Sequence, residues 1–125
     1  MKDVWFWAVE NSQLAVIDDL IGKGIDVNVK NKYGSTALMR SIWNGYLDVV
    51  TKLIEAGADV SVKNEYGSMA LVCASELGYL DIVTKLIEAG ADVNSKNNWG
   101  ETALSKALEN DCVECCRYLG NEVVM

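Results

Sequence analysis

The sequence repeats itself with a period of 33 residues. The period is marked by Asn31, Asn64 and Asn97. Residues 31–63 and 64–96 are identical at 22 of 33 aligned positions without a gap. A fixed period of this length is typical of repeat proteins, in which each structural unit contacts only its neighbours. The period therefore constrains the fold more than any other feature of the chain.

Within one period the residues predict two short helices separated by a tight turn. Thr36 is a suitable N-cap for the first helix, and Gly45 supplies the left-handed residue that ends it. The second helix begins near Leu47, and its apolar residues recur at helical spacing. Asp48 and Lys52 are four residues apart with the acid first, the better order for an ion pair along a helix. Helices this short are unstable alone in water, so we expect successive pairs to stack.

These residues resemble the ankyrin-repeat family. The family repeat has a hairpin loop, a first helix that starts with a T-P-L-H type of sequence, and a second helix that ends in G-A-D-V-N. Here the helix starts read TALM (36–39), MALV (69–72) and TALS (102–105), and the loops read GIDVN (24–28), GADVS (57–61) and GADVN (90–94). The resemblance covers almost the whole chain. It implies an all-α ankyrin-repeat solenoid of four helix-turn-helix repeats with short hairpin loops.

The resemblance also implies how the chain is divided. A single domain, 1–125, would consist of an N-terminal capping repeat at about 3–30, internal repeats 31–63 and 64–96, and a C-terminal capping repeat 97–125. The chain departs from the family pattern at two positions of the repeat. The family proline is replaced by Ala37, Ala70 and Ala103, and the family histidine by Phe6, Met39, Val72 and Ser105. Because that histidine ties loops together by hydrogen bonds, we expect looser polar contacts between the loops.

In ankyrin proteins, partners usually contact the hairpin tips and the exposed side of the first helix of each repeat. Carried onto this sequence, the resemblance implies partner-binding positions in three repeats. They are Lys32, Tyr33, Ser35, Arg40, Trp43 and Asn44, then Glu65, Tyr66, Ser68, Glu76 and Leu77, then Asn98, Trp99, Glu101, Glu109 and Asn110. Trp43 is the sharpest candidate, because equivalent positions hold Glu76 and Glu109 and the fold therefore does not require an apolar group there. The alternative is that its ring packs over a neighbouring helix.

Three aromatic residues share one position in successive repeats: Tyr33, Tyr66 and Trp99. We expect their rings to form a row along the loop edge. Large aromatic side chains are favoured at binding hot spots. They can equally pack on the next hairpin and hold the loops in line, and the sequence leaves both interpretations open.

The N-terminal segment predicts a helix that carries further aromatic residues. Asp3 can act as its N-cap. Trp5 takes the position of the buried leucine in later repeats, and Phe6 takes the position of the family histidine. We expect both to fill the core of the first repeat. Trp7 matches Arg40 in repeat position, so an exposed Trp7 would extend the binding surface.

Four cysteines are present: Cys73, Cys112, Cys115 and Cys116. The run CVECC resembles part of a metal site, but zinc usually takes two separated pairs of ligands or histidines, and the chain has no histidine. At least two of the three clustered cysteines are expected in the core, where cysteine behaves as a small hydrophobe. We expect no metal, and we expect free thiols, which indicate the reducing cytoplasm. Cys112 should be the most exposed and the most easily oxidised.

Composition narrows the class of function. The net charge is −7, and residues 64–125 contain 10 acidic and 4 basic residues. A nucleic-acid-binding protein normally has a basic surface, and this chain is acidic, so we expect no nucleic-acid partner. If the partner is charged, we expect it to be a basic protein. Without histidine the chain lacks the commonest general base and both Ser-His-Asp and Cys-His nucleophile arrangements. No apolar run approaches the roughly 18–20 residues of a membrane span, so no membrane association is expected.

We therefore predict a non-catalytic protein–protein interaction module, monomeric and without cofactors. It would act as an adaptor, scaffold or binder that grips a partner with its hairpin tips and concave helix face. One alternative is a small acidic inhibitor or immunity-type protein of a basic toxin or enzyme. An alternative of another class is a small-ligand receptor, in which groove aromatics stack on a planar ligand.

Overall fold

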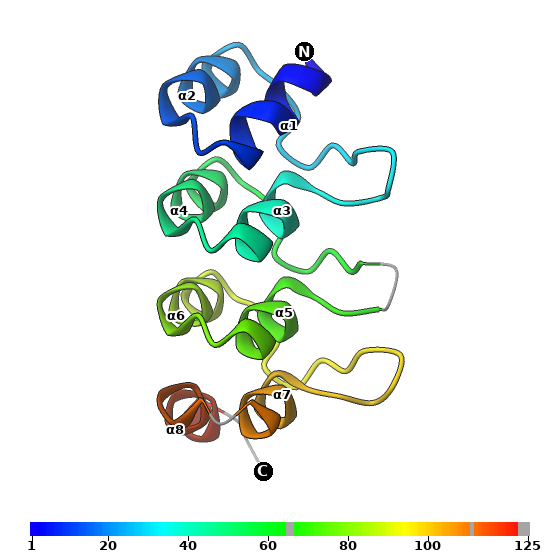
Figure 1. The fold of residues 1–125 in the computed structure, drawn as a ribbon, viewed down its shortest axis with the longest axis vertical. Helices are drawn as coiled ribbons and strands as arrows, with labels where there is room; N and C mark the ends of the chain where they lie inside the picture. The colour runs from blue at the N-terminus through cyan, green and yellow to red at the C-terminus, as the bar shows by residue number, and fades with distance from the viewer. Residues whose placement is uncertain (65–66, 111, 123–125) are drawn as a thin grey trace. The chain divides into compact units, whose positions relative to one another are not determined.

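A computed structural model describes residues 1–64, 67–110 and 112–122 (Figure 1). The chain divides into two compact units, residues 1–59 and 60–125, and each contains two helix pairs. The first unit consists of α1 (Lys2–Glu10), α2 (Leu14–Gly22), α3 (Ala37–Asn44) and α4 (Leu47–Glu55). The second consists of α5 (Ala70–Leu77), α6 (Leu80–Glu88), α7 (Ala103–Glu109) and α8 (Val113–Glu122). Within the described ranges there are no strands, which confirms the prediction of an all-α chain built from four helix pairs.

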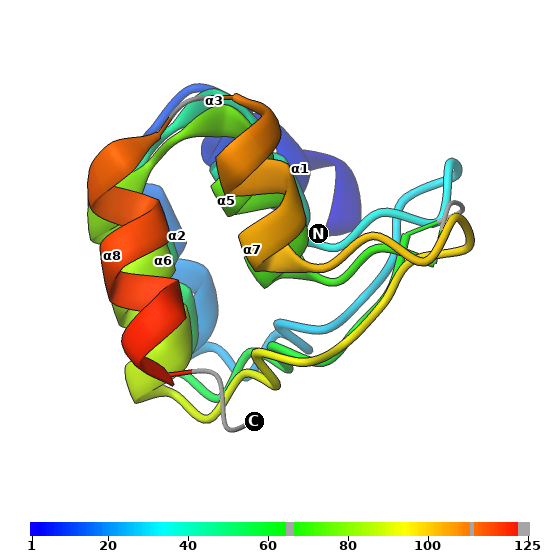
Figure 2. The same cartoon turned by 90° about the horizontal axis from the view of Figure 1, so that it is seen from below.

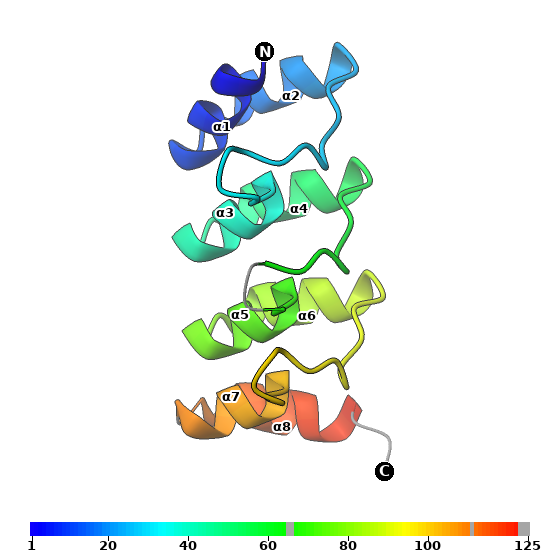
Figure 3. The same ribbon diagram turned by 90° about the vertical axis from the view of Figure 1, so that its right-hand side faces the viewer.

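Each unit has two layers of helices. In the first unit α1 packs beside α3 and α2 beside α4. In the second, α5 packs beside α7 and α6 beside α8. In each unit the long loop that joins the two helix pairs extends away from both layers, as Figure 2 shows, and Figure 3 views these loops from the tip side. Within each unit, therefore, the first helices share one layer and the hairpin loops lie to its side.

The helix boundaries in the second repeat follow from local chemistry. The Thr36 side chain accepts a hydrogen bond from the Met39 N–H at 3.4 Å and so caps α3. Gly45 adopts φ +70°, the left-handed conformation that ends this helix. Ile42 of α3 and Leu53 of α4 are fully buried. Each such side chain contributes about 1.5–3 kcal/mol by its removal from water, so packing between helices stabilises elements that are too short to be stable alone.

The first helix differs from prediction at its start. α1 begins at Lys2 with Met1 at the N-cap, and no side chain caps it. Asp3 is the second residue of α1, and in this first turn its carboxylate still interacts favourably with the helix dipole. The predicted N-cap role of Asp3 is therefore wrong. Trp5 is fully buried and Phe6 is half-buried, as expected for residues that fill the core of this repeat.

The hairpin loops are held by the asparagines that mark the 33-residue period. The Asn31 Oδ1 atom accepts hydrogen bonds from the N–H groups of Tyr33 at 2.9 Å and Ser35 at 3.0 Å. The Asn97 Oδ1 atom accepts from Trp99 at 3.0 Å and from the Glu101 N–H at 2.9 Å. A side-chain oxygen that bonds its own backbone two residues on stabilises a tight turn without any core. Each loop therefore keeps its shape while its tip residue stays at the surface.

Gly67 makes a close approach to the next hairpin loop of its unit. A Cβ atom there would lie 2.3 Å from Asn98 Oδ1 and 3.3 Å from the Asn98 backbone nitrogen, and φ is +72°. The equivalent Gly100 has φ +77° but nothing within 4 Å of such a Cβ. We predict that Gly67→Ala lowers the free energy of unfolding by about 2 kcal/mol and that Gly100→Ala lowers it by about 1 kcal/mol. Both substitutions put alanine in a strained left-handed backbone conformation, but only Gly67→Ala also brings the new Cβ atom into a clash with Asn98.

Urea unfolding of the two glycine variants measures this difference. Adding Asn98→Ala to Gly67→Ala removes the clashing side chain, so the double variant should recover part of the loss. Equal losses for Gly67→Ala and Gly100→Ala would contradict the close packing of the two loops.

Candidate functional site

The structure places most of the predicted partner-binding residues at the surface. In the first unit Lys32, Tyr33, Trp43 and Asn44 are exposed, and Ser35 and Arg40 are half-buried. In the second unit Glu76, Asn98, Trp99, Glu109 and Asn110 are exposed, and Leu77 and Glu101 are half-buried. Glu65 and Tyr66 lie outside the described residues.

Ser68 is buried, so its predicted exposure is wrong. Its backbone is fully used in closing the hairpin loop. The Ser68 N–H donates to Asn64 Oδ1 at 3.0 Å, and its carbonyl accepts from the Asn64 N–H at 2.9 Å. Ser68 therefore supports the loop from inside and is removed from the set of candidate contact residues.

Two aromatic rings project from the described hairpin tips. Tyr33 is 74% exposed and Trp99 is 66% exposed. The Lys32 ammonium lies 5.1 Å from the centroid of the Tyr33 ring, a cation–π distance. Both side chains are therefore largely open to solvent at the tips of their loops.

The layer formed by α1 and α3 carries two more exposed tryptophans. Trp7 is 53% exposed and Trp43 is 47% exposed. Trp7 is three residues from Glu10 on α1, and Trp43 is three residues from Arg40 on α3, a spacing that puts each pair on one helix face. We call the surface formed by Trp7, Glu10, Arg40, Trp43 and Asn44 the tryptophan patch.

Glu10 is the centre of the tryptophan patch. Its carboxylate forms an ion pair with the Arg40 guanidinium and accepts a hydrogen bond from the Asn44 side chain at 3.1 Å. The Tyr46 hydroxyl donates to the Glu10 carbonyl at 3.3 Å. The hydrogen bond from Arg40 lowers the pKa of Glu10 below its ordinary value of 4.5, against the opposing effect of burial and with a further contribution from Asn44. Arg40 and Asn44 are therefore held in place by α1 before any partner arrives.

We predict that Glu10→Gln lowers the free energy of unfolding by about 1 kcal/mol at pH 7, the upper end of the range for a partly exposed ion pair. Because the folded pKa of Glu10 lies below its unfolded value, the stabilisation is complete above about pH 4.5 and is lost as the pH falls through the folded pKa. Urea unfolding from pH 7 to pH 3 should show the gap between wild type and Glu10→Gln closing below pH 4.5. A gap that is the same at both ends would contradict an ionic role for Glu10.

The equivalent position to Arg40 in the last repeat is Lys106, which is buried within an acidic cluster. Its ammonium lies 3.2 Å from Glu101, 3.2 Å from Glu109 and 3.7 Å from Glu76. Burial acts to lower the pKa of Lys106, but hydrogen bonds to Glu109 and Glu101 and the charge of Glu76 outweigh it, and the pKa is raised. Hydrogen bonds from Asn97 and Lys106 lower the pKa of Glu101. Three carboxylates around one ammonium leave this surface of the second unit acidic.

One ion pair in each unit follows a rule that was not predicted from the sequence. Arg40 pairs with Glu10 and Lys106 pairs with Glu76, and both separations are 30 residues. A cation thus contacts a glutamate that stands three positions later in the preceding repeat. The signal in the sequence was opposite charge at a spacing of 30. Glu10, Glu76 and Glu109 occupy one position of the repeat, and Trp43 is the residue at that position in the second repeat. The second repeat therefore lacks the glutamate that the other three repeats carry there.

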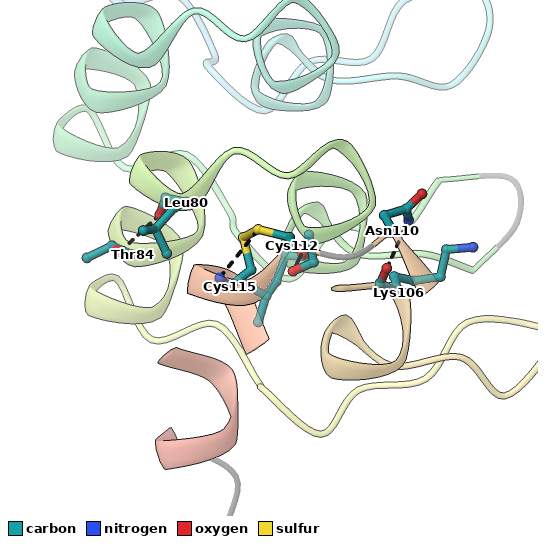
Figure 4. The surroundings of a disulfide bond; sticks show 8 residues. Leu80, Thr84, Lys106, Asn110, Cys112 and Cys115 are labelled. Atoms are coloured by element: carbon teal, nitrogen blue, oxygen red, sulfur yellow. Dashed lines mark hydrogen bonds between the residues drawn. A yellow bond between two sulfur atoms is a disulfide. The ribbon is translucent and has the colours of Figure 1, made fainter. Parts of the chain in front are cut away.

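The cysteines depart from expectation. Cys112 and Cys115 form a disulfide at the start of α8 (Figure 4), so the expectation of free thiols is wrong for these two. Their Cα atoms are 5.3 Å apart, a normal spacing for a disulfide, because a helix start brings residues three apart close together. Cys73 and Cys116 are free. Burial, with the charge of Glu76, raises the pKa of Cys73 to about 11. Of the three clustered cysteines only Cys115 is buried, so the expectation that at least two of them lie in the core is wrong, because Cys112 and Cys116 stay partly exposed at the start of α8.

Within the described parts of the chain, no three histidine, cysteine or acidic side chains gather in a metal-binding arrangement. No described helix is long and apolar enough to cross a membrane. A comparison with curated protein sequences finds no match. The family model for ankyrin repeats (three copies) matches residues 5–97 and 42–124. These matches span almost all of the sequence and agree with its helix pairs and hairpin loops, so the chain belongs to the ankyrin-repeat family.

Proposed function

We propose that this protein is a non-catalytic interaction module that binds another protein through its hairpin tips and the tryptophan patch. Ankyrin repeats generally serve as protein–protein interaction modules and are typically non-catalytic. The observation that carries the proposal is the exposure of Trp7 and Trp43 on the two helices, α1 and α3, that the Glu10–Arg40 ion pair joins. Tryptophan and arginine are the residues most enriched at binding hot spots.

The patch supports tight binding because much of it is already ordered. Glu10 fixes Arg40 and Asn44, so these two side chains lose little rotamer freedom when a partner docks. Trp43 replaces a glutamate that other repeats carry at this position, so the fold has no need of its indole ring. Both points favour a contact role for the patch over a purely structural one.

The charge distribution supports a basic partner. The first unit carries 6 basic and 8 acidic residues, and the second carries 5 basic and 10 acidic residues. Opposite charge accelerates association and makes its rate sensitive to salt. The same excess of acidic residues also supports a narrower proposal, in which the protein is an acidic inhibitor or immunity-type protein of a basic toxin or enzyme. An association rate that is equal at low and high salt would count against a basic partner.

We propose further that the protein is a cytoplasmic monomer. The free cysteines Cys73 and Cys116 support a reducing compartment. The Cys112–Cys115 disulfide opposes it, because structural disulfides persist mainly in oxidising compartments. A cytoplasmic location therefore requires that this disulfide be readily reduced in the folded protein.

The test is capture of a partner from lysate by immobilised wild type, Trp43→Ala and Leu108→Ala. Leu108 is a matched control, since it is an exposed apolar residue outside the predicted surface. We expect wild type and Leu108→Ala to retain the same protein and Trp43→Ala to retain much less of it, corresponding to a loss of about 2 kcal/mol. Equal capture by all three folded proteins would remove Trp43 from the binding surface.

A further inference from the structure

Three of the four cysteines lie within residues 112–116, at and just after the N-cap of α8, and the proposed binding function uses none of them. We propose that the Cys112–Cys115 disulfide is a reversible thiol–disulfide exchange site whose reactants are low-molecular-weight thiols and their disulfides. The site is defined by Cys112, Cys115 and the start of α8 (Figure 4). It lies entirely within the second unit and is independent of the tryptophan patch.

The sulfur of Cys112 occupies the N-cap position of α8. The Cys112 carbonyl accepts the first hydrogen bond of the helix, from the Cys116 N–H at 2.9 Å. Its Sγ atom accepts from the Cys115 N–H at 3.4 Å. The N–H groups of a first helical turn have no partner within the helix, and they stabilise negative charge at the N-cap. When the disulfide opens, a thiolate on Cys112 is therefore stabilised where it forms, as in other Cys-x-x-Cys pairs at a helix start.

The two sulfurs differ in access. Cys115 is fully buried, whereas Cys112 is partly exposed. Exchange requires an incoming thiolate to reach one sulfur of the bond, so attack occurs at Cys112. A mixed disulfide then forms between Cys112 and the small thiol, the Cys112–Cys115 bond breaks, and Cys115 takes the electron pair and then a proton. A second small thiol attacks the mixed disulfide, releases the oxidised small disulfide and leaves the Cys112 thiolate, which completes a two-electron reduction.

The other two cysteines provide internal references for this chemistry. Cys73 is buried and its pKa of about 11 keeps it protonated, so it should not react in the folded protein. Cys116 is half-buried and free, and it lies inside the first turn of α8 rather than at its N-cap. It shares the local environment of the site but lacks the capping position, so it serves as the matched thiol for comparing reaction rates.

The first experiment equilibrates the folded protein in glutathione buffers from fully reducing to fully oxidising, traps free thiols with iodoacetamide and maps them by mass spectrometry. We expect Cys112 and Cys115 to change together in one reversible two-electron transition, while Cys73 stays unmodified. Two results would overturn the proposal. One is a bond that resists excess dithiothreitol until the protein is unfolded, and the other is a pair that stays reduced in oxidised glutathione.

The second experiment separates the roles of the two sulfurs. In oxidised glutathione, Cys115→Ser should form a mixed disulfide at Cys112, whereas Cys112→Ser should form none at the buried Cys115. In reduced wild type, iodoacetamide should modify Cys112 about fivefold faster than Cys116 at pH 7. Far-UV circular dichroism checks that each variant is folded. If either serine variant unfolds, the rates at which iodoacetamide modifies Cys112 and Cys116 in the reduced wild type test the proposal instead. Equal rates at Cys112 and Cys116 would contradict the capping role.

Discussion

Replacing Leu71 by alanine is expected to lower the free energy of unfolding by about 3 to 4 kcal/mol. Leu71 lies on α5, has no exposed surface, and belongs to a helix that packs against both α6 and α7. The loss combines the transfer free energy of the deleted carbon atoms with the cost of the cavity they leave. Because α5 is held from two sides, its surroundings are poorly able to collapse into that cavity.

The same substitution one repeat later provides the matched control. Leu104 occupies the equivalent position on α7 but is only half-buried. Leu104→Ala should therefore cost about 1 kcal/mol, since little cavity forms at a partly solvated site. Urea unfolding followed by circular dichroism measures both values. Equal losses would mean that burial between neighbouring helices is not the source of stability.

Replacing Trp5 by alanine is expected to cost about 4 kcal/mol, because a large, fully buried side chain is removed from the first repeat. Replacing it by phenylalanine should cost only about 1 kcal/mol. Among the buried polar side-chain atoms that the structure describes, Trp5 Nε1 is without a hydrogen-bond partner. Phenylalanine removes this unsatisfied N–H, which offsets part of the packing loss.

The pair of Trp5 variants is measured by thermal and urea unfolding. The comparison isolates the indole N–H from the bulk of the side chain. A phenylalanine variant as unstable as the alanine variant would indicate that the N–H is satisfied in solution and that Trp5 is required for its shape.

The fold was predictable because its determinants are local. The Thr36 cap, the left-handed Gly45 and the start of α4 at Leu47 all lie where the sequence predicts them. Ion pairs were less predictable, because long side chains reach between repeats. Lys52 was expected to pair with Asp48 along α4, but its ammonium lies 2.9 Å from Asp18 of α2, 34 residues earlier.

The candidate surface was predictable in outline and not in detail. Arg40 and Asn44 were expected as contact residues, and both are already bound to Glu10, which no single repeat reveals. Ser68 was misplaced, because Ser68 is buried whereas the equivalent Ser35, with the same backbone hydrogen bonds, is only half-buried, and residue spacing does not separate the two. The disulfide depends on the orientation of two side chains at a helix start, which residue spacing alone does not fix.

The most direct test of the binding proposal is the affinity of the captured protein for purified wild type and Trp43→Ala, measured by titration calorimetry. We predict that Trp43→Ala binds about 30-fold more weakly, the equivalent of about 2 kcal/mol, with the melting temperature of the free protein nearly unchanged. An unchanged affinity for a correctly folded Trp43→Ala would contradict it.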